Sequence, residues 1–193
     1  CPYLKETTVI DRGRRGEMKF LFLDIDGTIV KDYKSTTLLI QVPITIAHFT
    51  DIEQIILVSN QGGVGLRKYL EEKGTNRDYR EMLPKECDVR NRIMKIRSAL
   101  NERTGIDVSA LMSFQFKLED GQFTQPDGER EWAWSWRKPG PGMIIHGLEW
   151  LGQLHKGHGL TYQDCLMVGD RDEDKLAAEY TGIPFVFNTE FFT

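Results

Sequence analysis

The sequence has few cysteines and histidines and no residue spacing typical of a zinc site. It contains three cysteines and four histidines among 193 residues. Cys1, Cys87 and Cys165 are far apart and form no CxC or CxxC pair, which argues against both a disulfide framework and a structural zinc site. The histidines show no ligand spacing with a cysteine or with one another. We therefore expect reduced thiols and no bound zinc.

Long apolar runs are also absent. No stretch approaches the ~20 apolar residues that cross a bilayer, and the charged residues Lys5, Glu6 and Asp11 interrupt what would be a signal peptide. These absences predict a soluble, cytoplasmic protein with no membrane partner. The chain begins with Cys1 rather than Met, so it can be a processed product or a piece of a larger protein. The sequence does not indicate an oligomeric state.

The net charge is small. Lys and Arg number 25 against 29 Asp and Glu, which gives a formal net charge of −4. This excludes a generally basic nucleic-acid-binding protein, although a local basic patch can still bind one phosphate or a strand end. A hydrophobic content of 40% with 10% aromatic residues excludes disorder. We expect one folded domain over residues 19–193, preceded by an N-terminal extension over residues 1–18.

Short apolar runs alternate with helix-like segments along the chain. The apolar runs predict buried strands at residues 19–25, 54–59, 110–116, 165–168 and 184–187. Apolar residues recur at helical spacing at residues 84–104, 143–156 and 172–180. Polar stretches over residues 67–80 and 117–137 show neither pattern. Because strands that alternate with helices predict βαβ crossovers, the expected fold is a doubly wound α/β layer with a mainly parallel sheet.

Acidic residues follow two of the apolar runs. Asp24 and Asp26 leave the first run two residues apart, and Gly27 permits a bend that turns both carboxylates toward one point. Asp170 follows the fourth run, and Asp174 comes four residues later. In an open parallel sheet, ligands bind beyond the carboxyl ends of the strands, and carboxylates at an apolar terminus need a cation or a shared proton. These oxygens predict a metal-binding site, and an all-oxygen set favours Mg²⁺.

Candidate phosphate-binding groups occur in two other segments that the predicted fold brings to the carboxyl edge of the sheet. Ser59 and Asn60 end the second run and offer hydroxyl, amide and backbone donors. Lys138, before Pro-Gly-Pro-Gly, can neutralise phosphate charge. Each has a simpler explanation, a turn for Ser59 and Asn60 and a solvated loop for Lys138. Gly62–Gly65 lacks the Gly-Lys-Ser/Thr ending of a P-loop and predicts a flexible strand-to-helix loop.

Four segments, taken in order, resemble the four motifs of the haloacid dehalogenase (HAD) superfamily of phosphatases. They are DIDGT at 24–28, VSNQGG at 58–63, RKPGPGM at 137–143 and VGDRDED at 168–174. The resemblance covers about residues 19–190, nearly the whole chain. It implies the Rossmann-like fold of that superfamily and a Mg²⁺-dependent hydrolase of phosphoric monoesters.

The resemblance also implies a role for each motif residue. Asp24 would be the nucleophile that forms an aspartyl-phosphate, and Asp26 would protonate the leaving oxygen and later activate water. The transferring phosphoryl group would be bound by Ser59, Asn60 and Lys138. Mg²⁺ would be held by Asp24, the backbone carbonyl of Asp26, and Asp170. Supporting roles would fall to Thr28, Arg137 and Asp174.

The second and third motifs are similar to one branch of the superfamily, subfamily III. This branch contains histidinol-phosphate phosphatases, heptose-bisphosphate phosphatases and polynucleotide 3′-phosphatases. The first two often carry a Cys/His zinc loop before the Arg-Lys-Pro block, whereas residues 118–136 contain neither Cys nor His. The interval between Thr28 and Ser59 is too short for a large cap domain, which predicts an open site.

The substrate stays open at this point. A phosphorylated small metabolite, such as a sugar or amino-alcohol phosphate, fits the acidic net charge and is slightly favoured. A DNA or RNA 3′-phosphate fits the open site and the alternating Trp132, Trp134 and Trp136, which would place three indoles on one face of an extended segment. The same tryptophans fit a hairpin packed on the body equally well. A non-catalytic scaffold protein is disfavoured because nucleophile, acid, lysine and metal-binding carboxylates occur together.

Overall fold

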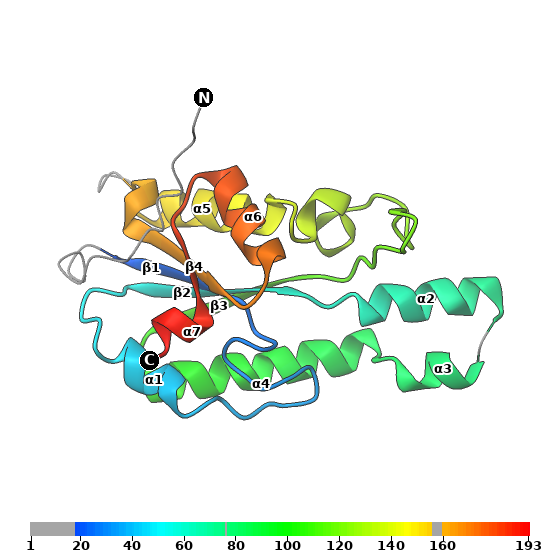
Figure 1. Ribbon diagram of the computed structural model, residues 1–193, viewed down its shortest axis with the longest axis horizontal. Helices are drawn as coiled ribbons and strands as arrows, with labels where there is room; N and C mark the ends of the chain where they lie inside the picture. Colours follow the sequence, from blue (N-terminus) through cyan, green and yellow to red (C-terminus); the bar gives the residue numbers. More distant parts are fainter. Residues whose placement is uncertain (1–17, 76, 156–159) are drawn as a thin grey trace.

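The computed structural model describes residues 18–75, 77–155 and 160–193 (Figure 1). The expected N-terminal extension over residues 1–18 lies outside these residues apart from Met18, so that domain boundary stays a prediction. Cys1 and residue 156, the expected end of the second long helix, also lie outside them. Among the described residues, no helix combines the length and the apolar character that a bilayer-spanning segment needs.

A parallel sheet forms the centre of the described structure. Its strands are β1 (Phe20–Leu23), β2 (Gln54–Asn60), β3 (Asp107–Ser113), β4 (Cys165–Gly169) and β5 (Phe185–Phe187). They are arranged in the order β3-β2-β1-β4-β5, and every pairing is parallel. The chain therefore moves outward from β1 in one direction and returns to β1's other side for β4 and β5. This order confirms the predicted doubly wound α/β fold.

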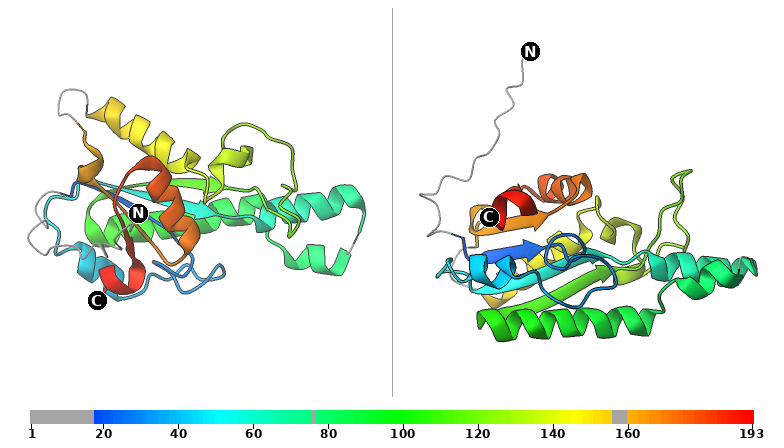
Figure 2. Two further views of the ribbon diagram at one scale, coloured as in Figure 1. Left: turned by 45° about the horizontal axis from the view of Figure 1, so that its top comes forward. Right: turned by 60° about the horizontal axis from the view of Figure 1, so that its bottom comes forward.

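Helices cover both faces of the sheet (Figures 1 and 2). The helices next to the sheet are α1 (Gln41–Ile46), α4 (Glu86–Thr104), α5 (Gly142–Leu154), α6 (Asp172–Thr181) and α7 (Asn188–Phe191). Alternation along β1 builds a core on each face: Leu21 and Leu23 pack with residues of α1 and α4, whereas Phe20 and Phe22 pack with residues of α5 and α6. Only α1 and loops lie between β1 and β2, which confirms that no large cap is inserted there.

The third strand begins and ends three residues earlier than the sequence suggests. The apolar run predicts a strand over 110–116, but β3 pairs with β2 from Asp107 opposite Gln54 to Ser113 opposite Asn60. Phe114 leaves the ladder because its N–H donates to the carbonyl of Glu131 at 2.8 Å. The polar start of β3 lies at the exposed edge of the sheet, where strand pairing does not require apolar side chains.

The polar stretch over residues 67–80 is largely helical, which sequence periodicity does not predict. It contributes to α2 (Gly63–Lys73) and α3 (Arg77–Met82), which form an arm beyond the carboxyl edge of the sheet (Figure 1). Buried Arg67 holds the arm together by donating to the carbonyls of Arg80 and Leu83 at 2.8 and 2.9 Å. Polar contacts thus replace the apolar stripe that periodicity detects.

The expected flexible loop at Gly62–Gly65 is instead the start of α2. At Gly65, a Cβ atom would lie 2.3 Å from the carbonyl oxygen of Phe114. The absence of a side chain therefore lets α2 begin directly against the segment that follows β3.

The three alternating tryptophans do not share a face. Two short 3₁₀ helices, η2 (Arg130–Trp132) and η3 (Trp134–Trp136), replace the expected extended segment. Trp136 is buried and donates to the carbonyl of Met112 at 2.9 Å, while Trp134 donates to the carbonyl of Gln125 at 3.0 Å. Trp132 packs on the ring of Phe114 at 5.5 Å. Trp132 and Trp136 thus pack as the packing alternative predicts, whereas Trp134 is 45% exposed and stacks on Phe123.

Candidate active site

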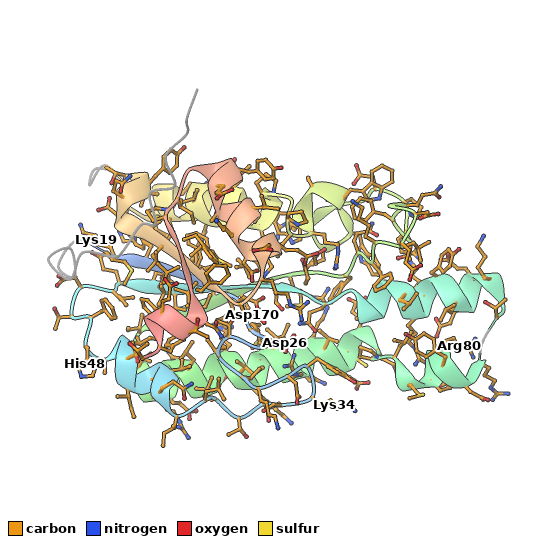
Figure 3. All side chains as sticks on the ribbon, in the orientation of Figure 1. Lys19, Asp26, Lys34, His48, Arg80 and Asp170 are labelled. Carbon is orange, nitrogen blue, oxygen red and sulfur yellow. The ribbon has the colours of Figure 1, made fainter. Side chains whose placement is uncertain are left out.

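The candidate site lies at the carboxyl edge of the sheet, where the strand order reverses between β1 and β4. Asp24 follows β1, and its backbone N–H donates to the carbonyl of Val168 in β4 at 2.9 Å. Asp170 follows β4. Figure 3 shows Asp26 and Asp170 together at this edge, above the middle of α4. Neighbouring parallel strands part at such a reversal, which leaves a crevice for a ligand.

A turn at Gly27 brings the chain back over the site. Gly27 has a φ of +86°, and a Cβ atom there would lie 2.3 Å from Oδ2 of Asp170. Asn188 donates to its carbonyl at 2.7 Å, and the hydroxyl of Thr28 lies 3.4 Å from Oδ2 of Asp24. The bend expected at Gly27 is therefore present, and it needs glycine both for its dihedral angle and for the approach of Asp170.

Three carboxylates meet in this crevice. One oxygen each from Asp24, Asp170 and Asp174 lies within 4.8 Å of the other two. Burial raises the pKa of Asp24 to about 7, even though Lys138 lowers it, and the other two carboxylates add to the rise. Burial likewise raises the pKa of Asp170, against the opposing effect of Arg171. Oδ1 of Asp170 is buried without a hydrogen-bond partner among the described residues. A hard divalent cation fits this donor set, because it would partner that oxygen and offset the crowded negative charge.

Lys138 supplies the positive charge within the site. Its Nζ lies 2.6 Å from Oδ1 of Asp24, 2.5 Å from Oδ1 of Asp174 and 2.8 Å from the carbonyl of Val58. Burial alone would lower the pKa of Lys138, but the two carboxylates raise it above its usual value. The ammonium therefore stays protonated. The lysine is 2% exposed, so it is not the solvated loop residue that its Pro-Gly surroundings suggest.

Asn60 positions Lys138 through its backbone. The side-chain amide donates to the carbonyl of Lys138, and the N–H of Lys138 donates back to Oδ1 of Asn60, both at 2.9 Å. The same amide lies 3.3 Å from a carboxylate oxygen of Glu173. Ser59 precedes Asn60, and its Oγ accepts a hydrogen bond from Gln61 at 2.8 Å. Both residues line the same cavity as Asp24.

The carboxylate of Asp26 has partners outside the three-carboxylate group. One of its oxygens accepts a hydrogen bond from Gln61 at 2.8 Å, and the other forms an ion pair with Arg92 of α4. Its carboxylate is not among the clustered ligand atoms. The expected contribution of its backbone carbonyl to a metal site stays a prediction.

Arg137 lies outside the cavity lining. Its guanidinium donates to the carbonyl of Gln115 at 3.0 Å, and burial lowers its pKa while Glu173 raises it. The neighbouring segment of the backbone, rather than the site, holds this side chain. The supporting role expected for Arg137 stays a prediction.

Sequence reasoning missed Gln61 and Arg92. Gln61 stands inside the VSNQGG segment, so its position next to Asn60 was a usable signal. Arg92 is one of several arginines on α4 and lies far from every motif in sequence. Nothing in the local pattern distinguishes it, because its partner Asp26 is 66 residues away.

The cavity at this site has a volume of about 350 Å³. More of its charged lining residues are acidic than basic. The acidic ones are Asp24, Asp26, Asp32, Asp170, Glu173 and Asp174, and the basic ones are Lys31, Lys138 and Arg171. Tyr33 contributes an aromatic wall.

Comparison with known proteins gives a family match and structural neighbours. The family model described as HAD-hydrolase-like matches residues 135–189. The search of curated proteins finds no match.

The fold is similar to that of a D,D-heptose 1,7-bisphosphate phosphatase from B. bronchiseptica, which was solved with magnesium and phosphate. The two structures have a TM-score of 0.56 and 22% sequence identity, over 87% of this chain and 79% of the other. A HAD-superfamily hydrolase of subfamily IA from Geobacter sulfurreducens has a TM-score of 0.35 and 15% identity over 89% of this chain and 87% of the other. The matched segment of the family model contains Lys138, Asp170 and Asp174 of the site. The chain is thus similar to HAD-like hydrolases over residues 135–189, and its fold is similar to that of the heptose-bisphosphate phosphatase.

Proposed function

We propose that the protein is a Mg²⁺-dependent phosphomonoester phosphatase that acts through an aspartyl-phosphate on Asp24. The observation that carries this proposal is the position of Lys138 between Asp24 and Asp174, at distances of 2.6 and 2.5 Å. A buried carboxylate next to a buried ammonium and two further carboxylates has little value as a packing arrangement. It suits a site that must hold a phosphoryl group and a cation together.

The side chains fit the two half-reactions of such an enzyme. In the first, an oxygen of Asp24 attacks phosphorus, the bond from phosphorus to the ester oxygen breaks, and Asp26 delivers a proton to the leaving oxygen. In the second, water attacks the phosphorus, gives a proton to Asp26, and releases phosphate with Asp24 restored. Asp26 is thereby returned to its protonated form for the next cycle.

The binding groups have complementary tasks. Lys138 neutralises charge on the phosphoryl oxygens as a fixed cation. The hydroxyl of Ser59 accepts a hydrogen bond from Gln61, so its own proton is free to be donated to a phosphoryl oxygen. Asp24 and Asp170 would hold Mg²⁺, with Asp174 beside them. The cation would add charge neutralisation for the nucleophile and the phosphoryl group.

The cavity favours a small phosphorylated metabolite over a nucleic-acid end. Its volume of about 350 Å³ is at the small end of ligand sites. Its acidic excess disfavours a polyanion. Of the tryptophans expected to stack bases, Trp132 and Trp136 are engaged in packing and only Trp134 is exposed, which weakens the argument for a polynucleotide 3′-phosphatase. The similar heptose-bisphosphate phosphatase supports a sugar phosphate.

The proposal is tested by comparing the wild type with Asp24→Asn on p-nitrophenyl phosphate and on a substrate panel. Asp172→Asn is the matched control, because Asp172 is an exposed carboxylate on α6 outside the cavity lining. We expect Asp24→Asn to lower kcat by roughly 10³-fold or more, since a nucleophile cannot be replaced by binding alone. Asp172→Asn should retain wild-type activity. Acid-quenched wild type should carry a phosphoryl group on the peptide that contains Asp24.

The panel should include sugar phosphates, amino-alcohol phosphates, nucleotides and 3′-phosphorylated oligonucleotides. Turnover that survives Asp24→Asn would refute the nucleophile. No turnover of any phosphoester by folded, Mg²⁺-loaded protein would favour a non-catalytic scaffold. A preference for oligonucleotides that weakens steeply with salt would overturn the assignment of a small substrate.

A further inference from the structure

Arg92 connects the middle of α4 to the carboxylate of Asp26. Its Nη2 forms an ion pair with Oδ1 of Asp26, and the arginine side chain is only 11% exposed. Arg92 and Asp26 are far apart in the sequence. The contact therefore exists only because the fold places α4 beneath the carboxyl edge of β1, as Figures 1 and 3 show.

The other oxygen of Asp26 is also held. Gln61 donates to Oδ2 of Asp26 at 2.8 Å and, through the same nitrogen, lies 2.8 Å from Oγ of Ser59. With one oxygen on Gln61 and one on Arg92, the carboxylate has little freedom to rotate. Asp26 and Asp24 line the same cavity, so this fixed carboxylate belongs to a residue at the space in which a phosphate ester would bind.

Arg92 further holds the loop that follows the first motif. Its Nε donates to the carbonyl of Ser35, and its Nη2 donates to the carbonyl of Asp32, both at 2.9 Å. Lys31, Asp32 and Tyr33 line the same cavity. A guanidinium can make these contacts at once because its donors are arranged in a rigid plane, which a lysine ammonium cannot reproduce. The side chain of Arg92 thus fixes the position of both the Asp26 carboxylate and one wall of the cavity.

We propose that Arg92 is a positioning residue that holds the carboxylate of Asp26 in place for proton transfer to the leaving oxygen. This inference rests on the proposed phosphatase function. General acid catalysis requires the acid within hydrogen-bond reach of the atom it protonates. Loss of Arg92 frees Asp26 and the 31–35 loop together, so the proton is no longer delivered from a fixed position.

The expected consequence depends on the leaving group. Departure of a strongly basic oxyanion needs a proton, whereas p-nitrophenolate leaves without one. Substituted phenyl phosphates vary this property with little change in size. In Arg92→Met, we expect kcat/KM for phenyl phosphate to fall roughly 10- to 100-fold and that for p-nitrophenyl phosphate to fall less than about 3-fold. The plot of log kcat/KM against leaving-group pKa should therefore become steeper.

Three variants complete the test. Arg92→Lys should recover part of the loss, because it restores the charge but not the planar set of donors. Arg97→Met is the matched control: Arg97 also lies on α4 and donates to a backbone carbonyl, that of Val108, at 2.6 Å, but it does not line the cavity. Its plot should keep the wild-type slope. In an Asp26→Asn background, adding Arg92→Met should not steepen the plot further, because the two residues act through one step.

The outcomes separate this inference from the proposed function. If the wild type shows no Asp24-dependent hydrolysis, the proposed function fails. If the wild type is active but Arg92→Met lowers kcat/KM equally for all leaving groups, or not at all, Arg92 has no positioning role and only this inference is overturned. Should both Arg92 variants fail to fold, a crystal structure of the wild type decides: Arg92 bound to Asp26 supports the inference, and Arg92 turned away from it overturns the inference.

Discussion

The side chain of Asn60 and the backbone of Lys138 form a two-bond clamp, with both hydrogen bonds at 2.9 Å. The clamp joins the end of β2 to the loop before α5 across 78 residues of sequence. The clamp fixes the backbone of Lys138. It therefore also fixes the point from which the Lys138 side chain extends to Asp24. Asn60 therefore contributes to the placement of Lys138, and the direct phosphate contact that the motif suggests stays a prediction.

We predict that Asn60→Asp weakens phosphate binding. An aspartate can still accept the hydrogen bond from the N–H of Lys138, but it cannot donate to the carbonyl, and it adds negative charge beside Glu173. We expect kcat/KM to fall about tenfold, with product inhibition by phosphate weakened in parallel. Asn91→Asp, at an exposed position on α4, is the matched control. Unchanged phosphate inhibition in Asn60→Asp would contradict the clamp.

Stabilisation by Mg²⁺ should depend on pH. In the metal-free protein, burial raises the pKa of Asp24 from its usual 3.8 to about 7, although Lys138 opposes the rise. The folded state therefore binds a proton that the unfolded state has released, so metal-free stability falls as pH rises from about 4 to about 7. A cation must displace that proton, so apparent Mg²⁺ affinity should rise about tenfold per pH unit up to about pH 7 and then level off.

This is measured as the change in Tm between EDTA and saturating Mg²⁺ at about pH 5.5 and about pH 8. Asp170→Asn should lose most of the Mg²⁺ effect, whereas Asp172→Asn should retain it, since Asp172 is outside the clustered carboxylates. An equal Mg²⁺ effect at both pH values, or in both variants, would be inconsistent with a cation held by Asp24 and Asp170.

Two glycines should respond in opposite directions to the same substitution. Gly27→Ala places a Cβ atom 2.3 Å from Oδ2 of Asp170 at a φ of +86°, so we expect a loss of about 2 kcal/mol or more in the free energy of unfolding. Gly152→Ala, in the interior of α5, meets no atom within 4 Å and should stabilise the protein by about 0.5–1 kcal/mol. Urea unfolding measures both. A neutral Gly27→Ala would show that the turn adapts without cost.

The two described cysteines should differ in reactivity. Cys165 is 1% exposed in β4, and burial raises its pKa to about 12, with a smaller contribution from the charge of Asp164. Cys87 is exposed on α4. At about pH 8 we expect iodoacetamide to modify Cys87 readily and Cys165 only after unfolding, because the thiolate is the reacting species. Peptide mapping by mass spectrometry measures both rates in one sample. Comparable rates in the native protein would mean that β4 opens readily.

Regular elements with an apolar pattern were predictable from the sequence. The stripe of Val89, Ile93, Ile96 and Leu100 is buried in α4, and Gly105 ends that helix with a φ of 71°. The polar helix α2 was not predictable, because the arm is stabilised by hydrogen bonds from Arg67 and not by an apolar stripe. The early end of β3 was missed for a similar reason: a contact from distant Glu131 draws Phe114 out of the ladder.

The sequence by itself determined the alternation of strands and helices and the acidic residues at the ends of β1 and β4, since both follow from local periodicity and turn chemistry. Only the tertiary structure decided that Asn60 holds the backbone of Lys138 and that Arg92 holds Asp26. Such contacts join residues that are 66 or 78 positions apart, and their geometry depends on how whole elements pack. Local sequence patterns do not predict that packing, because each polar side chain contacts its partner only after the sheet and helices have packed together.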